Sequence, residues 1–462
     1  MTERASHPTA TDEAIRTRVR DTIRTRLEDE SARAFVHCGP VRDPLIRYCL
    51  LAGINGARES DANSNASTLA TANGRAKHAD STPTANALTT NAPTATGTTV
   101  AIAVDREHEP EREHWYLETA TRKQRANGAT HPAEAVAKAI SETHGDGESG
   151  ERVLTPATIL HDAACYLERA GFILASSDVL STLRTTKDNF ELAALERAQT
   201  AARDGLERAR SMLATATVVR GDGDSEAKCD GLRTRTRTET GTKTETGTHS
   251  LELRAEVEVE GEGEDRVEGE GRSESESNPL TPADISSAVD QAVLDAGCRP
   301  VSTTVTGDDR LAADRPIEID ALVRTPSGYH GRLVRTLVVD PDGGAERRAH
   351  VALTHAFRSV RTMASASEHT VSALEADLEA EIRAFGFGES DAIDVQVTGI
   401  GLEPRERPIG SGESVAVGTT ICVDAAVGTD AGRVRLADVL VRTEDDAQWL
   451  SPASWSMRPS NE

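Results

Sequence analysis

The sequence is poor in lysine and in aromatic residues, and both shortages limit the partners that we expect. Only six of its 462 residues are lysine, and 3% are aromatic. Acidic residues exceed basic residues by 76 − 52 = 24, and the positive charge comes mainly from arginine. No long basic stripe crosses the segments that have a folded composition, so duplex nucleic acid is not an expected partner.

Closely spaced cysteines are also missing. None of the six cysteines pairs with another at the short spacing of a redox or zinc motif. Scattered cysteines without a secretory leader suit a reducing cytoplasm, so we expect a cytoplasmic protein with no membrane partner. A Gly-x-Ser-x-Gly elbow is absent too, which argues against a serine hydrolase of that type.

The acidic excess, the abundant threonine and alanine, and the lack of lysine are together typical of a salt-adapted, haloarchaeal cytosolic protein. Concentrated salt would screen the self-repulsion of such an acidic surface.

Two low-complexity segments set the expected domain organisation. Residues 59–98 are rich in Asn, Thr, Ala and Ser, and residues 221–278 contain Thr-Arg, Thr-Glu and Gly-Glu runs. Neither segment has enough apolar residues to offset the entropy of ordering, so we expect both to be disordered insertions. The chain is then expected to form two domains, residues 1–180 and residues 181–458.

The amino-terminal half alternates between strand-like and helix-like segments, which predicts an α/β domain. The expected strands are 34–37, 100–104, 115–117 and 152–154, and the expected helices are 43–52, 131–139 and 155–171.

The carboxyl-terminal half contains two hairpin patterns in which apolar residues alternate with polar ones. The first spans 317–340 and turns at Pro326-Ser327-Gly328, and the second spans 419–450 and turns at 429–432 and 444–446. Apolar residues at steps of three and four predict helices to cover these hairpins, at 188–213, 281–297 and 371–385. Thr281 followed by Pro282 is typical of a helix start.

The order of several short motifs resembles the creatinase and aminopeptidase P family. The motifs are Lys187, Asp188 and Glu191 at the first long helix, 327–331 with Arg335-Thr336 in the first hairpin, and Arg435, Asp438 and 443–445 in the second. The resemblance implies an α/β (α+β) protein, with a creatinase-like amino-terminal domain followed by the pita-bread domain shared with methionine aminopeptidase.

Active members of that family bind two divalent metals through two aspartates, one histidine and two glutamates, which generate a hydroxide nucleophile. The resemblance places these five positions at Asp320, Arg332, Thr398, Asp424 and Ala437. Only Asp320 is retained, and Asp424 replaces a glutamate. Two further family histidines are missing, and Arg405 stands at the downstream one. The remaining residues expected to line the pocket are Tyr329, His330, Glu406, Arg335, Arg435 and Asp438.

Two carboxylates and one guanidinium would give the site a formal charge of about −1, with no imidazole to coordinate a metal. We therefore predict that the dinuclear metal site is absent and that no metal cofactor is bound. We also hypothesise that Arg332 takes the place of the metal and pairs with Asp320 and Asp424. In the alternative interpretation, Arg332 points to solvent. Cys422 lies beside these positions, and we favour a core thiol over a nucleophile.

The expected function is that of a non-catalytic relative of Xaa-Pro aminopeptidases that binds a peptide or a protein partner. The family resemblance also implies a possible homodimer. The alternative is an active aminopeptidase that cleaves Xaa-Pro peptides with an atypical site. That alternative would require manganese, cobalt or zinc.

Overall fold

The structure is a computed structural model. It describes residues 10–51, 98–105, 114–121, 130–142, 150–220, 251–254, 279–307, 311–339, 341, 343–388 and 393–459. Within these residues, no helix is long and apolar enough to cross a membrane.

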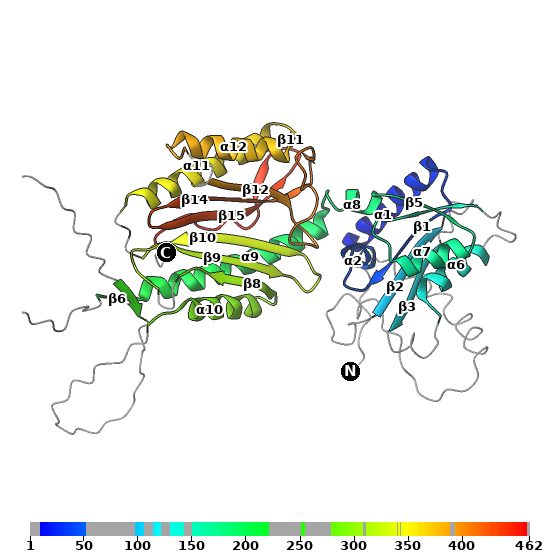
Figure 1. Cartoon of the computed structure of the whole chain (residues 1–462), viewed down its shortest axis with the longest axis horizontal. Helices are drawn as coiled ribbons and strands as arrows, with labels where there is room; N and C mark the ends of the chain where they lie inside the picture. The colour runs from blue at the N-terminus through cyan, green and yellow to red at the C-terminus, as the bar shows by residue number, and fades with distance from the viewer. Residues whose placement is uncertain are drawn as a thin grey trace, which may run out of the picture.

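The amino-terminal part is an α/β domain built on a mixed sheet (Figure 1). Its strands are β1 (Ala34–Pro40), β2 (Thr98–Asp105), β3 (His114–Thr121), β4 (Arg152–Thr155) and β5 (Ile173–Ser176). Its helices are α1 (Ala10–Asp29), α2 (Pro44–Leu51), α6 (Pro132–Glu142), α7 (His161–Arg169) and α8 (Val179–Leu183). The strand order is β3-β2-β1-β4-β5, in which β1, β4 and β5 are parallel and the other pairs are antiparallel.

Helices cover both faces of this sheet. One core cluster joins the sheet to α6 and α7, and a second joins it to α1, α2 and α8. Alternating strands and helices were predicted from the sequence, but α1 was not. Its buried residues Val19, Ile23 and Leu27 recur at steps of four, which was the available signal. Helix α7 starts later than expected, because Thr155 ends β4 and Ile159 closes a turn onto Pro156.

The carboxyl-terminal part is a second, larger domain. Its helices are α9 (Asn189–Thr215), α10 (Pro282–Asp295), α11 (Ala345–Ala366) and α12 (Val371–Ala384). Its main strands are β8 (Arg299–Val305), β9 (Ile317–Arg324), β10 (His330–Leu337), β12 (Ile393–Gly399), β14 (Thr420–Thr429), β15 (Gly432–Arg442) and β16 (Ala447–Trp449). The two short strands β11 (His369–Thr370) and β13 (Ser414–Val415) pair with each other. The main sheet has the order β12-β14-β15-β10-β9-β8, and β16 pairs with β15.

Both predicted hairpins are confirmed. Strands β9 and β10 pair from Arg324↔His330 to Leu337↔Ile317, across the turn at residues 325–329. Strands β14 and β15 pair from Thr429↔Gly432 to Thr420↔Val441, and β16 returns after the second turn.

The predicted helix starts are confirmed as well. The side chain of Asp188 accepts a hydrogen bond from the backbone N–H of Glu191, and the Glu191 side chain accepts one from Asp188. Thr281 and Asp284 form the same reciprocal capping box at α10.

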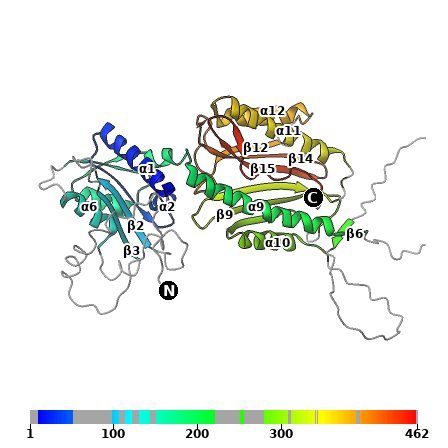
Figure 2. The ribbon, with the colours of Figure 1, turned by 180° about the vertical axis from the view of Figure 1, so that it is seen from behind.

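The helices cover one face of the main sheet in two pairs, as Figure 2 shows. Alternate residues of β9 and β10 pack against α9 and α10, and alternate residues of β12, β14 and β15 pack against α11 and α12. Because successive side chains point to opposite faces, the residues in between face away from these helices. That second face includes Asp320, Arg332, Asp424 and Arg435.

Part of the second expected insertion is structured. Leu251–Arg254 forms strand β7, which pairs antiparallel with β6 (Thr217–Arg220). The expectation of disorder is therefore wrong for this strand, in which backbone pairing with β6 outweighs the polar composition around it. Thr98, at the end of the first expected insertion, likewise begins β2. The other residues of both insertions lie outside the described residues.

Candidate functional site

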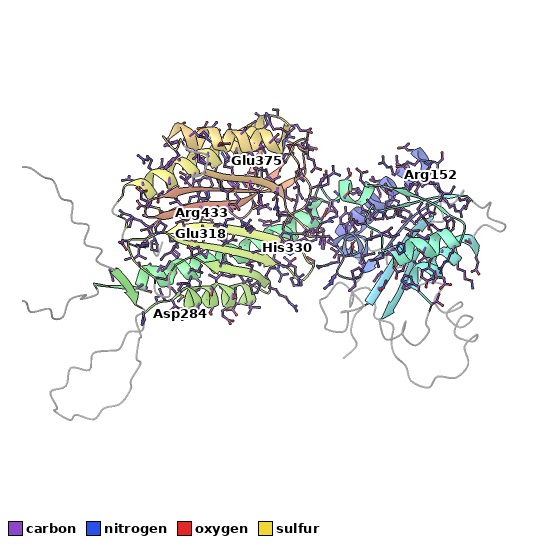
Figure 3. All side chains as sticks on the ribbon, viewed as in Figure 1. Arg152, Asp284, Glu318, His330, Glu375 and Arg433 are labelled. Atoms are coloured by element: carbon purple, nitrogen blue, oxygen red, sulfur yellow. The ribbon has the colours of Figure 1, made fainter. Side chains whose placement is uncertain are left out.

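Five charged side chains from four strands meet on the second face of the main sheet. Glu318 and Asp320 come from β9, Arg332 from β10, Asp424 from β14 and Arg435 from β15. Figure 3 labels Glu318 on this sheet, while His330 lies at the other end of the hairpin, toward the amino-terminal domain. We call Glu318, Asp320, Arg332, Asp424 and Arg435 the guanidinium cluster.

Arg332 makes both of the ion pairs that were hypothesised from the sequence. Its Nε and Nη2 donate to Oδ1 and Oδ2 of Asp320 at 3.1 and 2.6 Å. Its Nη1 lies 3.2 Å from Oδ2 of Asp424. The guanidinium thus joins β10 to β9 and to β14, and the interpretation in which Arg332 points to solvent is wrong.

Arg435 supplies a second guanidinium to the same place. Its Nε and Nη2 donate to the two carboxylate oxygens of Asp424 at 2.8 and 2.5 Å. Its Nη1 donates to Oε1 of Glu318 at 2.8 Å and to Oδ2 of Asp320 at 3.4 Å. The sequence analysis placed Arg435 in the pocket but missed Glu318. The missed signal was the spacing of Glu318 and Asp320, which puts both side chains on one face of a strand.

The electrostatics keep both arginines charged. Burial lowers the pKa of Arg332, but the hydrogen bonds and charges of Asp320 and Asp424 outweigh it and raise the pKa above the ordinary value. Burial likewise opposes the charged form of Arg435, and Asp424 and Glu318 reverse the effect, so that the pKa of Arg435 is raised. Three carboxylates and two guanidinium groups give the cluster a formal charge of 2 − 3 = −1.

The residues present do not fit the pair of divalent metals that the family resemblance implies. The carboxylates of Asp320 and Asp424 already accept charged N–H groups on both oxygens. Ala437 faces Asp424 across the β14–β15 pair and has no donor atom. A dication about 4 Å from a guanidinium would be repelled by about 8 kcal/mol at an effective dielectric constant of about 20. Among the described residues, no group of three or more His, Cys, Asp or Glu side chains is arranged to hold a metal.

Thr398 and Cys422 lie opposite each other on β12 and β14. Cys422 is buried in a small cluster with Val334, Ile400, Ala437 and Val439, and the partly buried Leu450 packs against this cluster. Burial, with Asp424 nearby, raises the pKa of Cys422 to about 12. The protonated thiol is therefore the stable form, which confirms the interpretation of Cys422 as a core residue.

Arg335 and Asp438 lie deeper in the domain than the pocket prediction placed them. Nη2 of Arg335 donates to Oδ2 of Asp438 at 2.6 Å, and each side chain is only 1% exposed. Nε2 of Gln199 on α9 donates to the other oxygen of Asp438 at 3.0 Å and also to the carbonyl of Arg332. This pair holds β10, β15 and α9 together, and its burial leaves it no access to a ligand.

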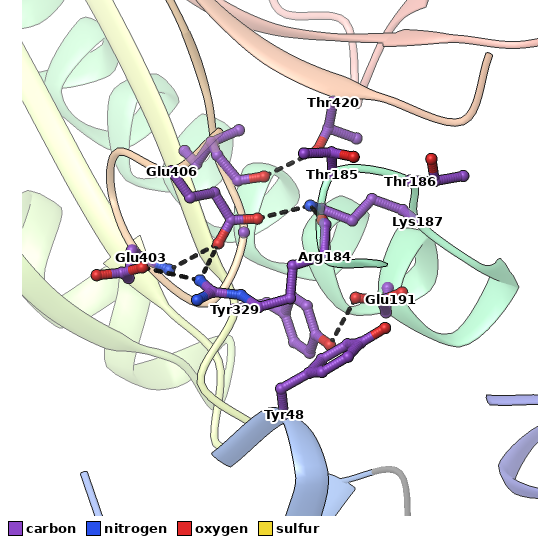
Figure 4. A network of polar contacts seen from close by, with 12 residues as sticks. Tyr48, Arg184, Thr185, Thr186, Lys187, Glu191, Tyr329, Glu403, Glu406 and Thr420 are labelled. Carbon is purple, nitrogen blue, oxygen red and sulfur yellow. Dashed lines mark hydrogen bonds and ion pairs between the residues drawn. The ribbon is translucent and has the colours of Figure 1, made fainter. Parts of the chain in front are cut away.

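Glu406 belongs to a buried network at the junction of the two domains (Figure 4). Its carboxylate accepts a hydrogen bond from Nζ of Lys187 at 2.6 Å and another from Arg184. Burial alone would raise the pKa of Glu406, but the charges of Lys187 and Arg184 outweigh burial and hold the pKa below the ordinary value. Arg405, the neighbour of Glu406, is exposed.

Tyr329 and His330 belong to the same junction rather than to the guanidinium cluster. The hydroxyl of Tyr329 donates to Oε1 of Glu191 at 3.1 Å, and Glu191 also binds Arg18 of α1 at 2.7 Å. Nδ1 of His330 lies 3.1 Å from the carbonyl oxygen of Gly401. Of the residues expected to line one pocket, the structure therefore brings Arg435 to the cluster and places Tyr329, His330 and Glu406 at the domain junction.

The sequence also matches a known protein family. The model of metallopeptidase family M24 matches residues 193–445, more than half of the chain. The chain belongs to family M24.

Solved structures with the M24 fold resemble the whole chain. Dipeptidase PepE from Mycobacterium ulcerans has a TM-score of 0.58 and 15% identity, and the match covers 97% of this chain and 98% of that one. Xaa-Pro dipeptidase from Bacillus anthracis has a TM-score of 0.55 and 12% identity over 95% and 99%. Prolidase from Pyrococcus furiosus has a TM-score of 0.53 and 14% identity over 93% and 99%. No curated protein matches the sequence.

The family and the α/β fold with a pita-bread domain, both expected from the motifs, are confirmed. At these identities the M24 structures show the fold alone. The correspondence of Asp320, Arg332, Thr398, Asp424 and Ala437 with family metal ligands stays a prediction.

Proposed function

We propose that this M24 protein is a non-catalytic relative of the Xaa-Pro peptidases that binds a peptide or a protein partner without using metal. The observation that supports the proposal is the guanidinium cluster. Arg332 and Arg435 bind the carboxylates that a metal centre would need, and the two arginines link four strands that a metal centre would otherwise hold together.

The same contacts indicate what these residues do in place of catalysis. A bidentate arginine–carboxylate pair fixes the relative orientation of two planar groups, so it can position strands as a metal does. It provides no Lewis acid and no bound hydroxide, and these are what peptide-bond cleavage in this family depends on. The scaffold would remain, and the reaction would be lost.

One observation favours the alternative of an active aminopeptidase. The side chain of Arg332 is 21% exposed, so it has a route to solvent. If it swung outward and Arg435 released Asp424, Asp320 and Asp424 could together hold a single manganese, cobalt or zinc ion and support cleavage of Xaa-Pro peptides.

A direct test measures metal content and peptidase activity on one preparation. The purified protein is assayed on Xaa-Pro dipeptides and tripeptides in dilute and in concentrated salt, with and without added manganese or cobalt. We expect less than stoichiometric metal and no metal-stimulated cleavage. Stoichiometric metal or stimulated cleavage would establish the active alternative instead.

Restoring the ligand set provides a positive control. The combined variant Arg332→Asp, Thr398→His, Asp424→Glu and Ala437→Glu returns the family's donor types to the four altered positions. We expect it to bind manganese more tightly than the wild type in titration calorimetry. Adding Asp320→Asn should reverse that gain, which would link the gain to the site.

The cellular setting is part of the proposal. We infer a cytoplasmic protein adapted to high salt, with a peptide or protein partner and with neither nucleic acid nor membrane as a partner. Size-exclusion chromatography with light scattering tests the possible homodimer.

A further inference from the structure

A cavity lies next to the guanidinium cluster, where the segment before β9 meets the turn between β14 and β15. Its volume is about 400 Å³, and its wall includes Glu318 of the cluster. Figure 3 shows Glu318 and Arg433 close together on this part of the sheet. Pockets for small molecules commonly have volumes of about 300–1,000 Å³, so the cavity suits a small ligand.

One wall of the cavity is apolar. Ala312 and Pro316 contribute aliphatic surface on one side and Ala431 contributes it at the turn, while Leu311 and Ile317 are buried in the core cluster. Two lining residues, Thr306 and Glu318, are fixed relative to each other, because the hydroxyl of Thr306 accepts a hydrogen bond from the backbone N–H of Glu318 at 2.8 Å. A preformed wall of this kind binds the apolar body of a ligand without first having to order itself.

Among the charged side chains of the lining, one arginine has no partner in the described residues. The carboxylate of Glu318 pairs with Arg435 at 2.8 Å, a guanidinium that also pairs with Asp424 and Asp320, and Arg433 pairs with Asp394 at 2.7 Å. The third charged residue of the lining, Arg315, makes no hydrogen bond or ion pair with any described residue. Within the part of the chain that the structure describes, the lining therefore has one guanidinium without a partner, which could bind an anionic group of a ligand.

We propose that this cavity binds a small monocarboxylate with an aliphatic body. The carboxylate pairs with Arg315, whose planar guanidinium can donate two parallel N–H hydrogen bonds to the carboxylate oxygens, and the body packs on Ala312, Pro316 and Ala431. A dianion is disfavoured because one cation of the described lining lacks a partner among the described residues, and a cationic ligand would be repelled by Arg315.

Two sources share this chemistry, a free short-chain carboxylic acid and the carboxyl terminus of a short peptide. The inference deepens the binding role proposed above and rests on it. Its test measures affinity rather than turnover or metal content, so it fails separately from the peptidase assay.

The aspartates beside the cavity do not cancel this charge. Asp314 and Asp430 flank the lining, but both are exposed and outside it. Salt screens exposed charges strongly, so the effects of these aspartates and of exposed Arg315 on a ligand should all fade as salt rises.

The test is titration calorimetry on the full chain with matched probes. Isovalerate represents the free acid, and an acetylated tripeptide that ends in leucine with a free carboxylate represents the peptide. The corresponding amides, isovaleramide and the tripeptide amide, remove only the charge, and inorganic sulfate tests for unspecific anion binding. We expect at least one carboxylate to bind about tenfold or more tightly than its amide, as loss of a charge-assisted hydrogen bond predicts.

Variants then locate the binding site. Arg315→Ala should weaken carboxylate binding about tenfold or more, and Ala312→Leu should weaken it by filling the cavity without any change in charge. Arg361→Ala, which removes an exposed arginine on α11, should bind as the wild type does. Because Arg315 is exposed, its variant should keep the wild-type melting temperature, which excludes misfolding as the cause.

Three results would overturn the proposal. They are equal binding of acid and amide, binding of sulfate as tight as that of either carboxylate, and unchanged affinity in Arg315→Ala. Failure of both carboxylates to bind at all would overturn it too.

Discussion

Arg435 binds Asp424 through two parallel hydrogen bonds, Nε to Oδ1 at 2.8 Å and Nη2 to Oδ2 at 2.5 Å. The two residues lie on adjacent antiparallel strands, and Arg435 also reaches Glu318 on β9. A guanidinium that binds two strands at once acts as a cross-link, in a fold where the family resemblance implies that metal ions have that role. Removing one partner of such a contact leaves the other charge without compensation, so substitutions here should be costly.

Arg332→Ala should lower the free energy of unfolding by about 1–3 kcal/mol. The variant loses charge-assisted hydrogen bonds to Asp320, but Arg435 still compensates Asp424, and the exposed fraction of Arg332 reduces the loss. Chemical denaturation measures the change. In the double variant Arg332→Ala, Asp320→Ala, the loss should be smaller than the sum of the single losses, and simple additivity would show that the pair does not interact.

Arg335→Ala should be more damaging, at about 3–5 kcal/mol, because it leaves Asp438 charged and buried. Arg383→Ala is the matched control, since the side chains of its ion pair with Glu379 are 35% and 42% exposed and the pair should contribute less than about 1 kcal/mol. Thermal and denaturant unfolding of both variants measure the difference. A similar loss in the two variants would mean that burial does not determine the strength of these pairs.

His330 should make the protein less stable as the pH falls from about 6.5 to about 4. Burial lowers the pKa of His330 to about 4 from its usual 6.5, so in this range the unfolded chain binds a proton that the folded chain does not. The loss is about 1.4 kcal/mol per pH unit, or about 3 kcal/mol in all.

Unfolding of the wild type and of His330→Gln at pH 7 and pH 4.5 measures this effect. The difference in stability between the two pH values should be smaller in the variant than in the wild type. Equal pH dependence in the wild type and His330→Gln would contradict the assignment.

Cys422 should resist alkylation in the native state. Its thiol is buried and its pKa is raised to about 12, so little thiolate is available to attack iodoacetamide. Among the cysteines that the structure describes, Cys165 is partly exposed and should react first. Mass spectrometry of tryptic peptides, with and without denaturant, reports both sites. Fast native labelling of Cys422 would reopen the question of a nucleophilic role.

Much of the local structure could be predicted because it depends on near neighbours. The hairpin turns need Gly, Pro, Asn or Asp at particular positions, and the capping boxes need two polar side chains three residues apart. Asp188 with Glu191, and Thr281 with Asp284, meet that requirement, and both helices begin where expected. The family motifs were recognised on the same local basis.

The prediction that these residues line one pocket was wrong where the contacts join residues far apart in the sequence. Arg435 and Glu318 are 117 positions apart, Arg335 and Asp438 are 103 apart, and Arg184 and Glu406 are 222 apart. The residues that were expected to line one pocket therefore lie in different parts of the structure. Strand β7 was missed for a similar reason, since its pairing with β6 is not encoded in its composition.

The order of residues alone determined the family, the two hairpins and the helix starts, because each depends on residue type and short spacing. Only the tertiary structure decided that two arginines neutralise the carboxylates that remain. Sheet pairing in the order β14-β15-β10-β9 brings these side chains within hydrogen-bonding distance on one face. Electrostatic attraction over such distances depends on where the chain folds, and no local pattern specifies it.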